Sequence, residues 1–236
     1  MKKRELKDAL YEQVARIGKA TSSPKRLELL ELLVQGEKSV EVLADELSIE
    51  IKLASAHLKV LKEARMVVAR KEGKFVFYRL AGEDVASLWV TLREVALEHL
   101  VELRVALDGM ASAPDKLSSI SRKQLMEQAK RGEVIVIDVR PRSEFDLAHL
   151  PYARSMPMNE IADRLAELPK STEIVAYCRG PFCLFAEEAA QLLKAHGRKV
   201  SKLQDGVAEW RSAGMPLNPK RPPEDRSLHS ELRPLR

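Results

Sequence analysis

The stretch that decides the fold of the first half of the chain is residues 51–80, IKLASAHLKVLKEARMVVARKEGKFVFYRL. In its first part, apolar residues recur at helical spacing, at Leu53, Ala54, Leu58 and Leu61. Two runs typical of strands follow, 66–70 and 74–80, and Lys71-Glu72-Gly73 between them is typical of a turn. We therefore expect a helix that leads into a two-stranded hairpin.

Two further helices are predicted before this stretch. Apolar residues at helical spacing begin after Ser23-Pro24 and end near Gly36, and those of 40–47 form a second, shorter set. Helix, short helix, helix and basic hairpin is the order of a winged helix-turn-helix, so this half is predicted to be mainly helical. Residues 83–107 are predicted to form one long amphipathic helix that is more apolar than a free surface helix. We expect it to pack against a copy of itself in a homodimer.

The charge of this half is concentrated in one window. Residues 1–108 hold 19 basic and 18 acidic residues, whereas 52–79 holds eight basic and two acidic ones, a net charge of +6. A surface of this density attracts the phosphate backbone of nucleic acid, and the alternative is a solvated helix face.

Four short motifs in this half carry a resemblance to a known family. They are Val42-Leu43-Ala44, the run from Ser55 to Leu61, the run from Ala64 to Val67, and the run from Glu72 to Leu80. Together they resemble the ArsR family of bacterial repressors over about residues 15–105. The resemblance implies that helix 51–62 turns Lys52, Ser55, Ala56 and Lys59 toward the major groove of operator DNA. Arg70, Lys71, Lys74 and Arg79 of the hairpin would then contact phosphates or a neighbouring minor groove, and His57 either contacts DNA or serves as a capping or packing residue.

Many ArsR regulators bind metal or metalloid through cysteines ahead of the recognition helix, but residues 1–108 contain no cysteine. His99 and Glu102 have the spacing of half of a second kind of metal site, and Ala86 and Leu88 stand where its other half would be. We therefore expect no metal site and no cofactor.

The second half alternates strands and helices. Helices are predicted at 121–130, around 161–168 and at 185–196, and apolar strands at 134–138, 174–177 and 200–203. This alternation predicts an α/β domain with a parallel sheet and helices on both faces. The length of 236 residues fits two domains: a DNA-binding and dimerisation domain at 1–108 and an α/β domain at 118–218, with a linker at 109–117 and a mobile tail at 219–236.

Both cysteines of the chain lie close together, at Cys178 and Cys183. Cys178 follows the strand at 174–177 and precedes a helix that begins near Leu184, a place where backbone N–H groups and the helix dipole stabilise a thiolate. A close pair in a cytoplasmic chain is more typical of reactive than of structural cysteines, and the alternative is an inert buried thiol. The charged N-terminus, the absence of a long apolar run and this pair lead us to expect a cytoplasmic protein with no membrane segment.

The second half also resembles the rhodanese family, over about residues 118–217. The matching motifs are Asp138-Val139-Arg140, Glu144-Phe145, His149-Leu150-Pro151 with Ala153, the loop from Cys178 to Cys183, and Asp205-Gly206-Val207 with Trp210, Gly214, Met215 and Pro216. The resemblance implies that Cys178 accepts a sulfane sulfur as a persulfide in a loop formed by Arg179, Gly180, Pro181 and Phe182. Leu184 stands where a related phosphatase would need an arginine, which disfavours phosphoryl transfer.

Cys183 admits two interpretations. Its thiol could attack a Cys178 persulfide, expel sulfide and leave a disulfide, if the two Cα atoms lie within about 7 Å. Alternatively, Cys183 packs at the start of the following helix.

The sequence thus predicts a dimeric regulator that binds operator DNA and detects a small sulfur donor or oxidant through Cys178. A sulfurtransferase enzyme tethered to a DNA-binding domain is the first alternative. A metalloid-responsive repressor with Cys178 and Cys183 as ligands is the second, although two thiolates leave a soft ion under-coordinated.

Overall fold

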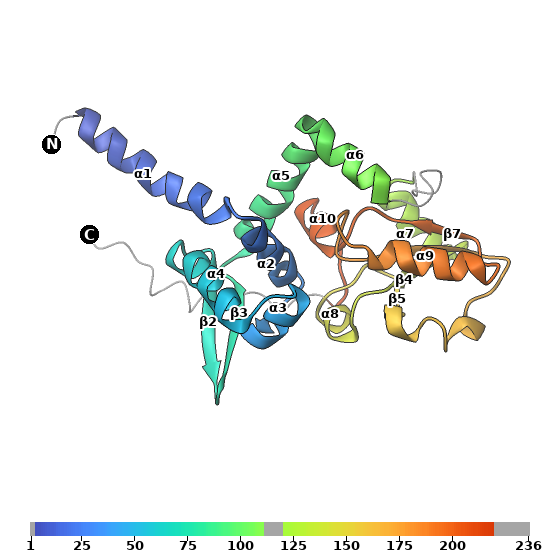
Figure 1. Ribbon diagram of the computed structural model, residues 1–236. Coiled ribbons are helices and arrows are strands. Elements are labelled where there is room, and N and C mark those ends of the chain that lie inside the picture. The colour runs from blue at the N-terminus through green and yellow to red at the C-terminus, as the bar shows by residue number, and fades with distance from the viewer. Residues whose placement is uncertain (1–2, 111–119, 220–236) are drawn as a thin grey trace.

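The computed structural model describes residues 3–110 and 120–219. Two domains follow one another along the chain, a winged-helix domain and a sheet domain (Figure 1). Most of the predicted linker at 109–117 and nearly all of the predicted tail at 219–236 lie outside the described residues.

The winged-helix domain has the predicted order of helix, short helix, helix and hairpin, and the structure adds a first helix, α1, and a short strand, β1, that were not predicted. The elements are α1 (Lys3–Thr21), α2 (Pro24–Val34), β1 (Lys38–Ser39), α3 (Val40–Glu46), α4 (Ile51–Glu63), β2 (Val67–Glu72) and β3 (Phe75–Leu80). The strands form an antiparallel sheet in the order β1-β3-β2. Leu29, Leu43, Leu58 and Leu61 are fully buried between the helices. Ser39 begins α3, because its side chain accepts a hydrogen bond from the backbone N–H of Val42.

The prediction of one long helix over 83–107 is wrong. The structure has two helices, α5 (Glu83–His99) and α6 (Val101–Met110), separated by Leu100 in an extended conformation with φ −102° and ψ 101°. The carbonyl of Leu100 accepts hydrogen bonds from the N–H groups of Leu103 and Arg104, so α6 starts afresh and runs in a new direction (Figure 1). No glycine or proline marks the break, and apolar periodicity continues across it.

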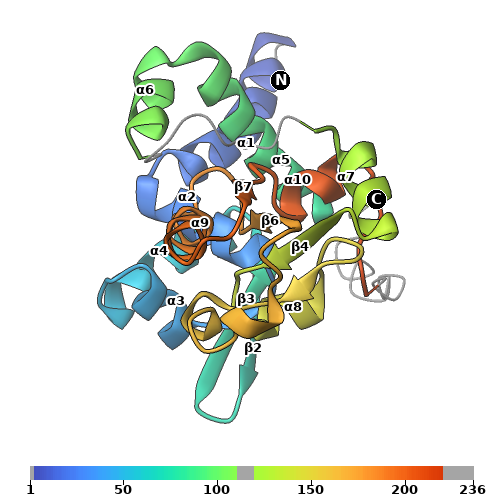
Figure 2. The ribbon, with the colours of Figure 1, turned by 90° about the vertical axis from the view of Figure 1, so that its right-hand side faces the viewer.

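The sheet domain has the predicted parallel sheet. Its strands are β4 (Val134–Asp138), β5 (Arg154–Ser155), β6 (Glu173–Tyr177) and β7 (Val200–Lys202), in the order β5-β4-β6-β7. Its helices are α7 (Arg122–Arg131), α8 (Arg142–Leu147), α9 (Phe185–Ala195) and α10 (Val207–Ser212). Side chains of β6 alternate between the faces, so that Ile174 and Ala176 pack with α9 while Val175 and Tyr177 pack with α7 and α10. Figure 2 shows α9 on one side of the strands and α7 and α10 on the other.

The predicted helix around 161–168 is wrong. Two short 3-10 turns, η2 (Met158–Glu160) and η3 (Leu165–Glu167), occupy this segment. Pro169 follows directly and cannot continue a helix. Ile161 and Leu168 are buried and hold the segment against the core, which explains the apolar spacing.

The two domains share an apolar contact. Val34, Ala86, Trp89 and Val90 of the winged-helix domain cluster with Ala208 of α10, and Phe182 packs against this group. In the described residues, no helix is both long and apolar enough to cross a bilayer. The cluster brings α5 directly against the loop that contains the cysteines.

Candidate functional site

The two cysteines lie at the carboxyl edge of the parallel sheet. Cys178 directly follows β6, Cys183 lies two residues before α9, and their sulfur atoms form a disulfide with a Cα–Cα distance of 6.2 Å. This distance meets the geometric condition of about 7 Å that the sequence analysis set for a bridge. Cys178 is buried, with 2% of its surface exposed, whereas Cys183 is half-buried.

Two glycines allow the loop its path. Gly180 has a φ of +144°, a backbone conformation that other residues rarely adopt. A Cβ on Gly206, which precedes α10, would lie 2.6 Å from the carbonyl oxygen of Cys178 and from the carbonyl carbon of Arg179. The Asp205-Gly206-Val207 motif therefore lies directly against the backbone of the cysteine loop.

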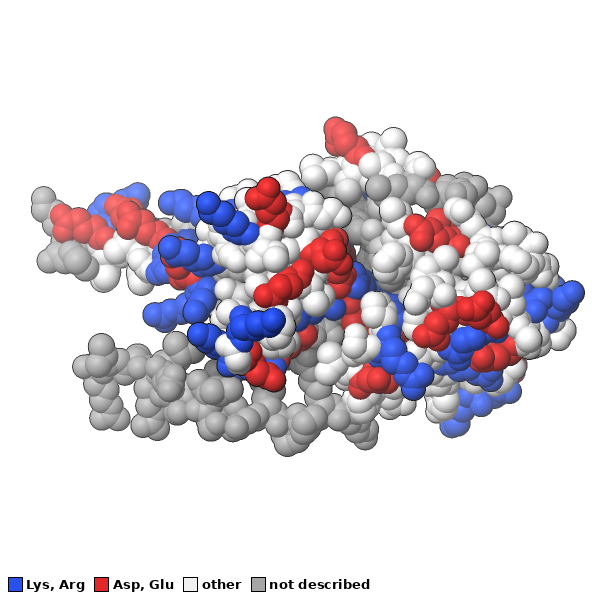
Figure 3. All heavy atoms as spheres, turned by 60° about the horizontal axis from the view of Figure 1, so that its bottom comes forward, with Lys and Arg blue, Asp and Glu red and all other residues white. Residues whose placement is uncertain are grey.

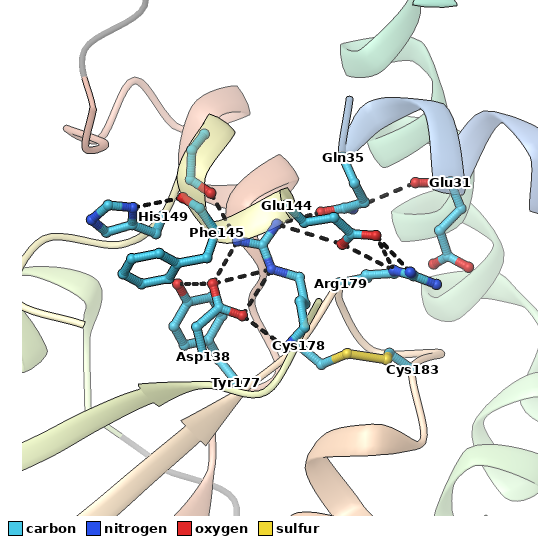
Figure 4. A network of polar contacts seen from close by, with 12 residues as sticks. Glu31, Gln35, Asp138, Glu144, Phe145, His149, Tyr177, Cys178, Arg179 and Cys183 are labelled. Carbon is cyan, nitrogen blue, oxygen red and sulfur yellow. Dashed lines mark hydrogen bonds and ion pairs between the residues drawn. A yellow bond between two sulfur atoms is a disulfide. The ribbon is translucent and has the colours of Figure 1, made fainter. Parts of the chain in front are cut away.

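The side chain of Arg179 extends away from the disulfide (Figure 4). Its Nη2 lies 2.6 Å from Oε1 of Glu144 in α8, and its Nη1 lies 2.5 Å from Oε2 of Glu46 in α3. Burial alone would lower the pKa of Arg179, but Glu144 and Glu46 outweigh it and raise that pKa. Arg179 was predicted as part of the sulfur-binding loop, and its guanidinium is engaged with these two carboxylates.

A second buried polar network lies beside the loop, at the carboxyl ends of β4 and β6 (Figure 4). Arg140 pairs with Asp138 at 2.5 Å and donates hydrogen bonds to the carbonyl of Ala148 and to Oε1 of Gln35, the residue that follows α2. The hydroxyl of Tyr177 donates to Asp138 and accepts from the N–H of Leu150. Burial and the nearby Asp138 raise the pKa of Tyr177 well above its usual value. The network fixes the strand end from which Cys178 emerges.

A cavity of about 660 Å³ opens at the carboxyl ends of β4 and β5, with Phe185 at the start of α9 in its wall. Its lining residues are Val139, Pro141, Arg142, Pro157, Met158, Asn159, Glu160 and Phe185. The backbone N–H of Val139 donates to the carbonyl of Tyr177, so this cavity adjoins the strand that carries Cys178. Among the described residues, no group of three or more His, Cys, Asp or Glu side chains could hold a metal ion.

The predicted recognition helix is α4. It buries Ala54, Leu58 and Leu61 against the core. The opposite face carries Lys52, Ala56 and Lys59, which are exposed, and Ser55 and His57, which are half-buried. Figure 3 shows basic side chains gathered on the winged-helix domain.

The hairpin residues predicted to contact phosphates differ in their surroundings. Lys71 and Lys74 are exposed near the β2-β3 turn. Arg70 is exposed too, but it pairs with both oxygens of Glu37 and with Glu72. Arg79 is half-buried and lines a second cavity with Leu147 of the sheet domain, so it lies nearer to the domain junction than to the hairpin tip.

Sequence reasoning missed the winged-helix residues that meet the cysteine loop. Glu46, Trp89 and Arg93 contact the loop at Arg179 and Phe182, and Lys38 and Gln35, which were missed as well, contact Glu144 and Arg140 beside it. Their partners in the sheet domain, Arg140, Glu144, Arg179 and Phe182, all lay in motifs quoted from the sequence. No local pattern identifies these partners, because each contact joins residues more than 80 positions apart in the chain.

Comparisons with known proteins agree with both domains. The family model for bacterial regulatory proteins of the arsR family matches residues 23–68, and the model for the rhodanese-like domain matches residues 121–213. The HTH-type transcriptional regulator Rv0324 of Mycobacterium tuberculosis is 44% identical over 90% of this chain and 93% of its own length. A protein named Sulfurtransferase from Allochromatium vinosum is 31% identical over 36% of this chain and 78% of its own length.

Among solved structures, the chain is similar to the homodimeric winged helix-turn-helix DNA-binding domain (fragment 1–100) of a possible ArsR-family regulator from Mycobacterium bovis. That domain is 48% identical, with a TM-score of 0.39, and the match covers 41% of this chain and 89% of the domain. The two family matches and the relative that spans both domains lead to one conclusion: the chain belongs to the ArsR family of bacterial transcriptional regulators, in a form that carries a rhodanese-like domain after its winged helix.

Proposed function

We propose that this regulator responds to reactive sulfur through Cys178 and Cys183, and that the state of this pair changes its affinity for operator DNA. The observation that carries the proposal is the position of the cysteine loop. The two bonded sulfurs lie in the loop between β6 and α9 and pack with the core beneath α9, and Arg179, which lies between them in sequence, pairs with Glu46 of α3. A change in the conformation of the loop therefore moves Arg179, which contacts the winged-helix domain.

The proposed reaction begins with the reduced pair. The Cys178 thiolate attacks the sulfane sulfur of a donor of the type R–S–SH; a bond forms between Sγ and that sulfur, the S–S bond of the donor breaks, and R–S⁻ leaves with the electron pair. Cys183 then attacks Sγ of Cys178, and hydrosulfide leaves. Two thiols are thereby oxidised to a disulfide, and the sulfane sulfur is reduced to sulfide. A low-molecular-weight thiol restores the reduced pair by exchange, and is itself oxidised to its disulfide.

The cavity beside β4 and β5 is the proposed approach for the donor. The other side of the loop is occupied, because Arg179, Gly180 and Phe182 contact the winged-helix domain. The apolar walls of the cavity, with Arg142 and Asn159 among its polar lining, suit a small organic persulfide with a polar end. We place this chemistry in the cytoplasm, where thiols are kept reduced until a donor arrives.

For the DNA-binding half, we propose that α4 enters the major groove with Lys52, Ser55, Ala56, His57 and Lys59, while Lys71, Lys74 and Arg70 contact the backbone. Arg70 would exchange its carboxylate partners for phosphate. Exposed Leu88, Leu92 and Val95 on α5 give the homodimer an apolar surface, and the related domain from Mycobacterium bovis, described as homodimeric, supports the same arrangement.

The test is a binding titration at fixed salt concentration. A duplex is first selected by the reduced, full-length protein from a pool of random sequences, and its Kd is then measured with reduced protein and with protein treated with glutathione persulfide. We expect a change of about 5- to 150-fold, the usual range for coupled sites. Reduced glutathione is the matched control and should change nothing. An identical Kd for both forms, or an undiminished response in Cys178→Ser, would overturn the proposal.

A sulfurtransferase remains the second candidate, because the sheet domain is similar to a protein of that name. Catalysis requires repeated access to the loop and a group that holds an anionic donor, whereas the guanidinium of Arg179 is paired with two carboxylates. Transfer of sulfur from thiosulfate to cyanide separates the two functions: many turnovers per chain would favour the enzyme, and a single stoichiometric modification would favour the regulator.

A further inference from the structure

The side of the cysteine loop that faces the winged-helix domain forms two separate contacts with it. The first is polar and starts at Arg179, the direct neighbour of Cys178. The second is aromatic and starts at Phe182, the direct neighbour of Cys183. Each half of the disulfide is thus one peptide bond away from a residue that touches the other domain.

The polar contact is a ring of four alternating charges, which we name the junction cluster: Arg179 of the loop, Glu46 of α3, Lys38 of β1 and Glu144 of α8. Lys38 Nζ lies 2.9 Å from Oε1 of Glu144 and 3.4 Å from Oε1 of Glu46, and Arg179 pairs with the same two carboxylates. The side chains of Lys38 and Arg179 are each 10% exposed and that of Glu144 is 2% exposed. The side chain of Glu46 is 23% exposed. Moving Arg179 would leave the buried Glu144 with Lys38 and the more distant Arg140, and removing a partner from a buried charge is costly.

The aromatic contact reaches α5. The rings of Phe182 and Trp89 meet edge to face with centroids 6.4 Å apart, and Cζ of Arg93 lies 5.6 Å from the Phe182 ring. Arg93 is buried and pairs with Glu31 of α2 and Glu209 of α10. A Cβ on Gly180 would come within 3.1 Å of Nη1 of Arg93, so α5 also lies close to the backbone of the loop.

The two contacts end on the elements that set DNA-binding geometry. Glu46 is the last residue of α3, and only Leu47–Glu50 separate it from α4, the proposed recognition helix. Trp89 and Arg93 lie in the middle of α5, whose exposed apolar face is the proposed dimer surface, on which the spacing of the two recognition helices depends.

We propose that the winged-helix domain reads the state of the cysteine pair through these two contacts, Arg179 with Glu46 on α3 and Phe182 with Trp89 and Arg93 on α5. The inference rests on the proposed function and adds the route of its regulation. Closing the Cys178–Cys183 bridge fixes the path of the four residues between the sulfurs. When the bridge is opened, or when a sulfur is added to Cys178, the backbone of residues 179–182 can adopt other conformations. The packing of Arg179 and Phe182 against their partners then changes.

The test compares variants on the winged-helix side, which leave every residue of the loop unchanged. Full-length Glu46→Gln and Trp89→Leu are each measured for the ratio of Kd between reduced and disulfide forms, on the duplex selected by the reduced wild type. We expect this ratio to fall at least several-fold toward one in both variants. The rate of disulfide formation with glutathione persulfide should stay as in the wild type, a result that a general loss of structure would not give. Asp45→Asn is the matched control, since it removes a carboxylate from the exposed side of the same helix, and it should keep the wild-type ratio.

The outcomes separate the inference from the proposed function. If the wild type responds and both variants respond equally well, the route is wrong and the sensing function stands. If the Kd of the wild type does not depend on the state of the cysteine pair, the inference and the proposed function are both wrong. Amide hydrogen exchange of the wild-type protein is a second test that needs no variant. Between the disulfide and reduced forms, the exchange rates of peptides that cover 40–46 and 85–93 should change, and those of 3–21 should stay the same. Equal exchange at 40–46 and 85–93 in the two forms would overturn the inference.

Discussion

Arg70 and Arg179 each pair with two glutamates, and they do so in opposite surroundings. Arg70 lies on the hairpin with its side chain 51% exposed and pairs with Glu37 and Glu72. Arg179 lies beside Cys178 with its side chain 10% exposed and pairs with Glu46 and Glu144. The first set of pairs is screened by water, so that Arg70 can exchange its partners for phosphate in the proposed complex with DNA, whereas breaking the second removes a cation from the buried Glu144. The same pairing is therefore weak on the proposed DNA-binding surface and strong at the junction between the domains.

The largest expected effect comes from removing the buried arginine. Arg179→Ala leaves Glu46 with Lys38, and leaves the buried Glu144 with Lys38 and, at 3.9 Å, Arg140. We expect the free energy of unfolding to fall by about 3 kcal/mol, the lower end of the range for breaking a buried pair. Urea denaturation of the reduced full-length protein measures it. Arg70→Ala is the control with the same number of partners in water, and it should leave the unfolding midpoint unchanged. Equal losses for the two variants would refute the distinction between the clusters.

Tyr177→Phe should have the next largest effect. Its hydroxyl bonds to Asp138 and to the N–H of Leu150 in a fully buried network, and hydrogen bonds to charged groups contribute about 1.5–3 kcal/mol. Because the partners of this hydroxyl, Asp138 and Leu150, both belong to the sheet domain, the variant should be less stable in urea yet keep the Kd ratio of the wild type. A collapsed Kd ratio with normal stability would contradict this assignment.

The pH dependence of stability should reveal the charge of Glu144. Burial alone would raise the pKa of this carboxyl, but Arg179 and Lys38 outweigh burial, and its pKa lies below the ordinary value. A lowered pKa contributes stability above the ordinary pKa of the unfolded chain, and this contribution is lost as the pH falls through the pKa of the folded state. The difference in unfolding free energy between wild type and Glu144→Gln should therefore be largest near neutral pH and shrink as the pH falls below about 4. If the difference in unfolding free energy does not change with pH, the charge of Glu144 does not contribute to stability.

The smallest effect is expected on the exposed DNA-binding face. Lys59→Ala on α4 should weaken binding to the selected duplex and reduce the slope of log K against log salt concentration by about one, as the loss of one phosphate contact does. Stability should not change. Lys123→Ala, an exposed lysine of the sheet domain, is the matched control and should keep the salt slope. A slope unaffected by Lys59→Ala would remove this residue from the interface.

The sequence was most informative where burial is local. The spacing of Ala54, Leu58 and Leu61 predicted α4 because all three face the same core, and apolar runs between turn residues predicted β4 and β6. It failed at Leu100, where an extended residue breaks a helix that keeps its apolar spacing on both sides. It failed again around Ile161, where two buried anchors seven positions apart imitate a helix.

The candidate site, too, was predictable from the sequence only in part. The position of Cys178 at a strand end followed from the order of strand, loop and helix, and the spacing to Cys183 raised a bridge as one of two possibilities. The partners of Arg179 and Phe182 could not be predicted, because Glu46 and Trp89 belong to the other domain and carry no motif. Contacts between domains depend on the shape and charge of two folded surfaces, and the spacing of apolar residues along the chain carries no information about them.

If Cys178 and Cys183 form one sulfur-reactive unit, mass spectrometry will detect it in the reduced protein after one equivalent of glutathione persulfide. We expect the peptide holding both cysteines to lose two hydrogens while one sulfide is released per chain, and Cys183→Ser instead to gain one sulfur on Cys178. A wild-type peptide that is unchanged in mass, with no sulfide released, would contradict it.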